Sequence, residues 1–229
     1  MKIRHHRHSC MTVTLAGKRV LIDPGNLADP NVGHRTGIDA ILITHAHPDH
    51  ADPDFIDDLL LRNKGIPVYA EPEAALKLSK AGRNIEPIRP GQVITLDGGV
   101  EILAVGGRHA QIHRDLEPIG NIGFVLTAPG EPRLGVTGDS LHPQSEWTGV
   151  DLLAAPVAAP WSSLQETIDF LRASHPKRYL PVHDAILSKA GRRIFVEQIK
   201  NAVEPRTSVV EWNEQGTLQV KHDFESLDF

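Results

Sequence analysis

Residues 43–50 read ITHAHPDH, a stretch that places three histidines and an aspartate directly behind an apolar run. In an extended segment, side chains two positions apart point the same way, so His45 and His47 can bind one ion from one side. Asp49 and His50 follow a proline, where a turn or the start of a helix can direct them towards a second ion. Neutral imidazole is a ligand of zinc and of similar first-row metals. The stretch therefore predicts the beginning of two metal sites, in preference to a polar loop whose histidines cap strand and helix ends.

Apolar and turn-forming residues on both sides of the motif predict its structural setting. Residues 39–43 are a short apolar run and predict a buried strand that leads into the histidines. Residues 53–63 predict a helix after the motif, with Asp52 as its N-cap and Pro53 at its first position. The order strand, site, helix follows.

The rest of the chain predicts a hairpin before the motif and alternating elements after it. Residues 10–15 and 19–22 are the hairpin strands, and pairing of Leu15 with Lys18 would place His8 beside the end of the second strand. The other periodic segments predict strands at 67–70, 92–96, 100–105, 122–127, 133–137, 151–155, 178–180, 208–212 and 217–220, and helices at 73–80, 162–173 and 188–202. Two mixed sheets with helices outside would bury the apolar faces of these elements.

Length and composition restrict the class of protein. With 229 residues, of which 40% are hydrophobic and 23% charged, we expect one globular domain over 1–229; a split into two smaller domains is the alternative. The net charge of -5 gives no general reason to expect a nucleic-acid or membrane partner, although a local basic patch is compatible with it. Cys10 is the single cysteine, which excludes an intrachain disulfide. The sequence has neither a secretory signal nor a membrane-spanning run, and we expect a cytoplasmic protein.

Several motifs together resemble one known family. Residues 44–50 match the HxHxDH signature of the metallo-β-lactamase superfamily, and the chain resembles its branch of small metal-dependent hydrolases, which includes ascorbate-phosphate lactonases and N-acyl-phosphatidylethanolamine phospholipase D-type proteins. Residues 8–10 (His-Ser-Cys) are similar to the GHS start of that branch, with Arg7 in place of glycine. Asp23 resembles the aspartate that supports the histidine loop by hydrogen bonds without binding metal. The resemblance implies an α/β fold, the four-layer αββα sandwich, with metals at one edge between its sheets.

The remaining ligands are sought at strand ends and compared with the family pattern. His109 follows a predicted strand and two glycines and is our choice for the third nitrogen of the first ion; His113 is the alternative. Asp139, in a Gly-Asp-Ser motif, is expected to bridge the two ions, and His183, in a Pro-x-His motif, to complete the second site. The implied sites are His45, His47 and His109 with Asp139, and Asp49, His50 and His183 with Asp139.

Such a centre implies hydrolytic chemistry. Structural zinc closes its coordination shell, often with thiolates, whereas these sites would keep open positions. Two ions roughly 3.5–4 Å apart can hold a bridging hydroxide that attacks an ester, lactone, amide or phosphodiester. We expect two divalent ions, zinc in the first instance, with manganese or iron as alternatives. We assign catalytic roles to Asp49, His8 and His113. Two predictions are open for His8: it contacts the substrate or a residue behind the metals, or it is an ordinary surface histidine. Asp184 is a further candidate proton donor.

Three classes of function are consistent with these residues. The first is a dinuclear hydrolase of small or medium substrates, the second a nuclease or phosphodiesterase acting on nucleic acid, and the third a non-hydrolytic di-metal protein. The negative net charge argues against a nuclease that binds nucleic acid. The complete ligand set argues against a non-hydrolytic protein. We further expect His5 and His6 to be exposed strand residues, Cys10 to be packed, and Trp161 either to line a pocket or to anchor a helix. A homo-oligomer is compatible with the sequence.

Overall fold

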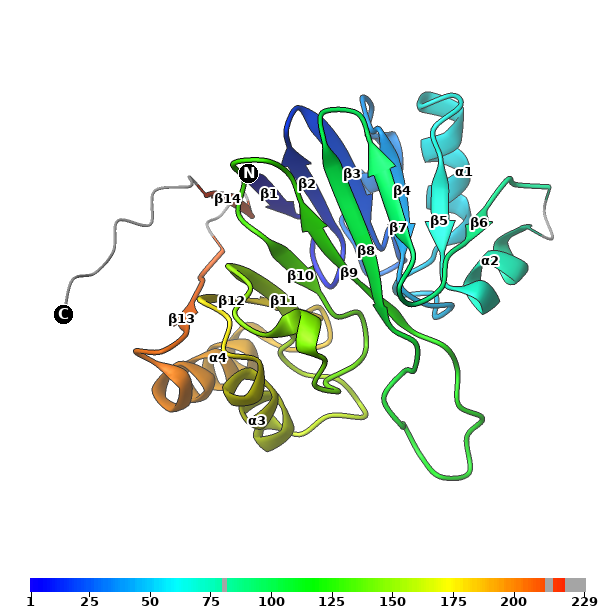
Figure 1. The fold of residues 1–229 in the computed structure, drawn as a ribbon. Coiled ribbons are helices and arrows are strands. Elements are labelled where there is room, and N and C mark those ends of the chain that lie inside the picture. Colours follow the sequence, from blue (N-terminus) through cyan, green and yellow to red (C-terminus); the bar gives the residue numbers. More distant parts are fainter. Residues whose placement is uncertain (80–81, 213–215, 221–229) are drawn as a thin grey trace.

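The computed structural model describes residues 1–79, 82–212 and 216–220, and within them the chain forms two seven-stranded sheets (Figure 1). The strands of the first sheet are, in spatial order, β14 (Thr217–Gln219), β1 (Lys2–His5), β2 (Met11–Leu15), β3 (Lys18–Ile22), β4 (Ala40–Ile43), β5 (Val68–Ala70) and β6 (Glu86–Pro87). Those of the second are β13 (Ser208–Val209), β12 (Arg178–Val182), β11 (Leu152–Pro156), β10 (Leu134–Val136), β9 (Ile122–Thr127), β8 (Val100–Gly106) and β7 (Val93–Leu96).

Both sheets are mixed, as the sequence predicts. In the first sheet β1, β2 and β3 pair antiparallel, and β3 to β6 are parallel. In the second, β7 to β10 are antiparallel and β10 to β13 parallel. The β2–β3 hairpin pairs Leu15 with Lys18, which confirms the predicted register.

Three apolar clusters bind the sheets and helices into four layers. The central cluster lies between the sheets and includes Ile3, Leu42, Phe124 and Leu180, all fully buried. A second cluster packs the outer face of the first sheet against α1 (Pro53–Arg62) and α2 (Pro72–Ser79). A third packs the second sheet against α3 (Leu164–Ser174) and α4 (Lys189–Val203). Figure 1 shows the two helix pairs on opposite outer sides, so the αββα prediction is confirmed.

The helices begin at side-chain caps. Asp52 accepts hydrogen bonds from the backbone N–H groups of Asp54 and Phe55 at 2.9 and 3.0 Å, and Pro53 follows it, as predicted. Ser163 and Glu166 form a reciprocal capping box at the start of α3. These bonds satisfy N–H groups that have no partner within the helix.

The N-terminal stretch corrects the expectation that His5 and His6 are exposed strand residues. His6 is not exposed: only 3% of its surface is accessible, and its Nε2 lies 2.8 Å from Thr12 Oγ1. His5 lies in β1, half-buried, with its ring stacked on Trp212. Cys10 is buried, as expected. The polar N-terminal stretch gave no sign that β14 would pair with β1 or that Trp212 would stack on His5.

Element ends differ from the predictions by a few residues. The predicted strand at 208–212 pairs over Ser208–Val209 alone, and β6 has no apolar alternation by which it could be predicted. The predicted helix at 73–80 is α2, whose last predicted residue, Lys80, lies outside the described residues. Among the described helices there is none whose length and hydropathy would suit a membrane span.

The α1 cap provides a test of the local energetics. Asp52→Ala removes the acceptor for two N–H groups and should lower the free energy of unfolding by about 1 kcal/mol. Asp52→Asn is the matched control, since its amide oxygen can still accept. Urea denaturation of both variants measures the difference, and equal midpoints for the two would contradict the capping role.

Candidate metal centre

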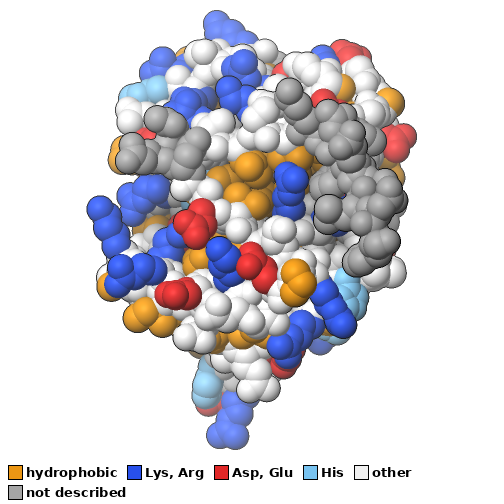
Figure 2. Space-filling view, turned by 90° about the vertical axis from the view of Figure 1, so that its left-hand side faces the viewer, with side chains coloured by type: hydrophobic (Ala, Val, Ile, Leu, Met, Phe, Trp, Pro, Cys, Tyr) orange, Lys and Arg blue, Asp and Glu red, His pale blue; other side chains and the backbone are white. Residues whose placement is uncertain are grey.

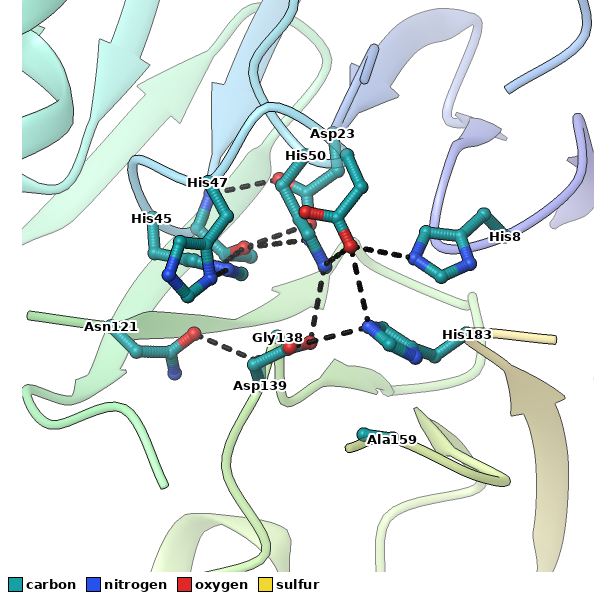
Figure 3. A network of polar contacts seen from close by, with 12 residues as sticks. His8, Asp23, His45, His47, His50, Asn121, Gly138, Asp139, Ala159 and His183 are labelled. Carbon is teal, nitrogen blue, oxygen red and sulfur yellow. Dashed lines mark hydrogen bonds and ion pairs between the residues drawn. The ribbon is translucent and has the colours of Figure 1, made fainter. Parts of the chain in front are cut away.

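The predicted ligands come together at one edge of the sandwich (Figure 3). Each of four follows the carboxyl end of a strand: His45 follows β4, His109 follows β8, Asp139 follows β10 and His183 follows β12. β4 belongs to the first sheet and the other three strands belong to the second, and all four end at the same edge. The convergence on which the sequence hypothesis depends is therefore present in the structure.

The first donor group consists of His45, His47, His109 and Asp139. One ligand atom from each lies within 4.8 Å of the others. His45 Nε2 is 3.1 Å from His47 Nδ1, and His109 Nε2 is 3.5 Å from Asp139 Oδ2. This is the predicted first set, and His113 is not part of it.

The second donor group consists of His8, Asp49, His50 and His183, again with ligand atoms within 4.8 Å. Asp139 adjoins this group as well, with Oδ1 3.2 Å from His50 Nε2 and Oδ2 3.3 Å from His183 Nε2. Asp139 thus faces both groups. His8 is a member that we did not predict as a ligand: its Nε2 is 2.9 Å from Asp49 Oδ2.

Four buried polar atoms in this cluster have no hydrogen-bond partner in the part of the chain that the structure describes. They are His50 Nε2, His109 Nε2, His183 Nε2 and Asp139 Oδ1. Buried polar atoms are almost always paired, so a concentration of unpaired ones indicates a missing ligand. Three imidazole nitrogens and a carboxylate oxygen are suitable donors for a divalent first-row ion, and the residues fit the group that the family implies.

The opposite nitrogens of the same rings are all engaged. Each ring donates its Nδ1–H to an oxygen of the chain: His50 to Asp23 Oδ2 at 2.7 Å, His109 to Ala110 O at 2.6 Å and His183 to Ala158 O at 2.7 Å. These bonds hold the proton on Nδ1 and leave the Nε2 lone pair facing the cluster. Such bonds behind the ligands are what orient metal-binding histidines.

Asp23 supports the histidine loop from behind, in the place that the resemblance implies. It is fully buried and accepts from Thr44 N and Thr44 Oγ1, both at 2.8 Å, and from His50 Nδ1. Asp23, His8 and His183 all have positive φ (48°, 52° and 61°). Residues other than glycine rarely adopt this backbone conformation. Three such residues close together are typical of a functional site.

The charges in the cluster suit a cation. Burial opposes charge on the His50 ring, but Asp139 and Asp23 outweigh it and raise the pKa of His50 well above its usual value. Burial alone would raise the pKa of the Asp139 carboxyl, yet the facing His50 and His183 rings hold it well below the usual range. His45, by contrast, has its pKa lowered by burial and by the neighbouring His50. The ionised carboxylate therefore draws positive charge to this position, which either a protonated His50 ring or a bound cation can supply.

The other residues singled out from the sequence lie as follows. His8 is fully buried, so the surface alternative is wrong for it. The His113 side chain is 59% exposed on the loop after β8, and its Nδ1 accepts from Asp115 N–H at 3.2 Å. Asp184 Oδ2 accepts from Arg192 Nε at 2.7 Å. The structure does not bring His113 into either donor group, and its catalytic role stays a prediction.

Two contacts with Asp139 were not found from the sequence. Asn121 Oδ1 accepts from Asp139 N–H, and its Nδ2 donates to Thr137 O, both at 2.9 Å. Trp161 Nε1 donates to Asp139 Oδ2 at 3.1 Å, and the ring also lines a pocket. For Asn121 the sequence carried no signal, whereas Trp161 was expected to line a pocket or to anchor a helix, without a contact to Asp139.

Two pockets flank His109. The larger, about 1040 Å³, is lined by the loops after β8 and β10, by Trp161 and by α3. The smaller, about 270 Å³, lies between His47 and the apolar side chains of the loop at 112–119. Arg108 lines both pockets. Both pockets thus border the donor cluster at His109, and the smaller one borders it at His47 as well.

Comparison with known proteins identifies the family. A family model described as the beta-lactamase superfamily domain matches residues 2–183, so the chain belongs to the metallo-β-lactamase superfamily. It is 38% identical to Protein Rv0786c of Mycobacterium tuberculosis over 196 residues, covering 85% of this chain and 89% of that one. It is 27% identical to the UPF0173 metal-dependent hydrolase TTHA1283 of Thermus thermophilus over 191 residues, covering 80% and 83%.

A solved structure shows the same fold. A Parabacteroides distasonis protein, provisionally designated a metal-dependent hydrolase, superposes with a TM-score of 0.75 at 21% identity over 91% of this chain and 90% of that one. The family and the relatives named metal-dependent hydrolases together support assignment of this chain as a metal-dependent hydrolase.

Close backbone packing at Gly138 is a testable part of this site. A Cβ at Gly138 would lie 2.3 Å from Asn121 Oδ1 and 2.8 Å from Thr44 Cβ, at φ +60°. Gly138→Ala should therefore lower the free energy of unfolding by about 2–4 kcal/mol. Gly130→Ala has a similar φ of +73° with nothing within 4 Å, and should cost only the backbone strain, about 1 kcal/mol. Thermal or urea unfolding compares the two, and equal losses would contradict the packing argument.

Proposed function

We propose that this chain is a dinuclear metal hydrolase that cleaves an ester, lactone or phosphodiester of a small or medium-sized substrate. The observation that carries the proposal is the position of Asp139, whose carboxylate faces two groups of histidines with unpaired Nε2 atoms. A single buried carboxylate shared by two such groups is poorly suited to one structural ion. It is well suited to a bridge between two.

The residues divide into two sets around this bridge. His45, His47 and His109 would hold one ion, Asp49, His50 and His183 the other, and Asp139 both. When bound, two such ions supply a water of lowered pKa as nucleophile and Lewis acids for the developing oxyanion. Zinc is our proposal for the metal, because nitrogen ligands dominate the set and thiolates are absent from it; the same ligands can also bind manganese or iron.

His8 is best described as a positioning residue for Asp49. Its Nε2–H donates to Asp49 Oδ2, and its Nδ1 accepts from Ala185 N–H at 3.4 Å, so both ring nitrogens are engaged. Its full burial argues against a direct part in proton transfer to a leaving group. Residues of the pocket loops, His113 among them, remain the candidates for that step.

The shape and charge of the surroundings favour a small substrate over a nucleic acid. Glu166 and Asp169 line the larger pocket together with Arg108, and two carboxylates there would repel a phosphate backbone. On the side of the molecule that carries α4 and β13, Figure 2 shows acidic side chains among the basic ones. We accordingly propose a metabolite-sized substrate for a cytoplasmic enzyme whose residues 1–229 act as one domain.

Metal content and turnover test the proposal directly. Protein purified without added metal should contain close to two divalent ions per chain and should turn over bis(p-nitrophenyl) phosphate or simple lactones. Asp139→Ala should lose both the metal and the turnover, because it removes the group shared by the two sets. Asp97→Ala, which alters a 95% exposed carboxylate in the β7–β8 turn, is the matched control and should retain both.

Two results would contradict the proposal. Full activity in Asp139→Ala would show that the bridge is wrongly assigned. Bound iron without any turnover would favour the non-hydrolytic di-metal alternative.

A nucleic-acid binding experiment distinguishes the nuclease alternative from the proposed hydrolase of small substrates. We expect no salt-dependent binding of a single-stranded DNA oligonucleotide, since the chain has a net charge of -5 and acidic side chains at its pocket. Fluorescence anisotropy across a salt series measures this. A steep fall of affinity with rising salt would indicate phosphate contacts and would favour the nuclease alternative.

A further inference from the structure

The segment between β11 and α3 contacts ligands of both proposed metal sets. Val157 to Ser162 follow β11 at the same edge as the donor cluster. Ala158 O accepts the Nδ1–H of His183, and Trp161 donates its indole N–H to Asp139 Oδ2. The Trp161 ring also meets the His109 ring edge-on, with centroids 5.8 Å apart and an interplanar angle of 73°.

The segment is held in place by its own hydrogen bonds. Val157 N–H donates to Val182 O at 2.8 Å, which ties it to β12. Ser162 Oγ accepts from Ala159 N–H at 3.0 Å, and Ser162 N–H donates to Ala159 O at 3.1 Å. These bonds close a tight turn directly around Trp161. The indole therefore has a fixed backbone from which to reach Asp139.

The hydrogen bond decides which lone pairs of Asp139 stay available. The indole N–H occupies one lone pair of Oδ2, and Oδ1 keeps no hydrogen-bond partner among the described residues. With Oδ2 fixed in this way, Oδ1 faces His50 Nε2 at 3.2 Å, while Oδ2 stays within 3.5 Å of His109 and His183. A carboxylate free to rotate would not keep Oδ1 directed at His50 and Oδ2 directed at His109 and His183.

We propose that Trp161 is a positioning residue that fixes the bridging carboxylate of Asp139 through its indole N–H and separates it from the larger pocket. The inference rests on the proposed dinuclear function. The half-buried ring lines that pocket together with Phe170, so the same side chain touches the space open to substrate and the ligand shared by both ions. A role limited to anchoring α3 would require the packing of the ring but not its N–H.

Trp161→Phe removes the N–H and keeps an aromatic ring, and Trp212→Phe is the matched control. Trp212 donates its indole N–H to Pro181 O at 2.9 Å and stacks on His5, so the same chemical change occurs at a backbone carbonyl. Loss of an outer hydrogen bond to a metal ligand typically weakens metal binding by roughly tenfold to a hundredfold. We expect at least a tenfold loss of zinc affinity in Trp161→Phe, measured by competition with a chromophoric chelator, and an altered visible spectrum of the cobalt-loaded protein. Trp212→Phe should match the wild-type chain in both.

A measurement on the wild-type chain keeps the proposal falsifiable if Trp161→Phe does not fold. The chain has three tryptophans, and their ¹⁵N-labelled indoles should give three resolved N–H signals. The Trp161 signal should shift markedly when zinc is added, because its acceptor becomes a metal ligand, and the Trp212 signal, assigned with Trp212→Phe, should not. Unchanged indole signals on zinc binding, or wild-type affinity and cobalt spectrum in Trp161→Phe, would overturn the role of Trp161 while leaving the dinuclear function intact. A wild-type chain that binds no metal would overturn both.

Discussion

The burial of the Asp139 carboxylate among imidazole rings is the constraint on which the rest of the site depends. The residue is 2% exposed, and one of its oxygens has no hydrogen-bond partner in the described part of the chain. An ionised carboxylate is costly to bury without compensation. Here the compensation comes from His50 and His183 on one side, His109 on another and Trp161 on a third. The three histidines that surround the carboxylate are also groups that can hold cations.

The fold supplies this arrangement through the carboxyl ends of its strands. β4 and β12 come from different sheets, and each delivers a histidine to the shared edge. Asp23, at the end of β3, holds the histidine loop through Thr44 and His50, and Asn121 holds the backbone of Asp139. The close approach of Gly25 to the backbone of Asp49, where a Cβ would lie 1.8 Å from Asp49 O, brings the two loops together without a side chain between them. The site is thus a consequence of how the two sheets end.

Local patterns predicted those features that depend on neighbours in the sequence. The period of apolar residues gave the sheets and helices, the Asp-Pro pair gave the start of α1, and the motif at 45–50 gave the histidine cluster. The choice of His109 over His113 agrees with a backbone feature: His109 N–H donates to Ile119 O at 3.1 Å, which keeps it at the base of the loop, while His113 lies on the exposed part. The sequence did not predict the burial of His6 or the contacts of Asn121 and Trp161 with Asp139. These features depend on segments that only the tertiary arrangement brings together. No local periodicity encodes them.

The proposed metal centre can be tested most directly by X-ray absorption on zinc-loaded protein. The account predicts a nitrogen- and oxygen-only shell and scattering from a second metal at roughly 3.5–4 Å, as in two-metal hydrolytic sites. The claim that Asp139 joins two histidine sets around a pair of ions would be contradicted by one bound ion per chain with no scattering from a second metal. A coordination shell that contains sulfur from Cys10 would also contradict it.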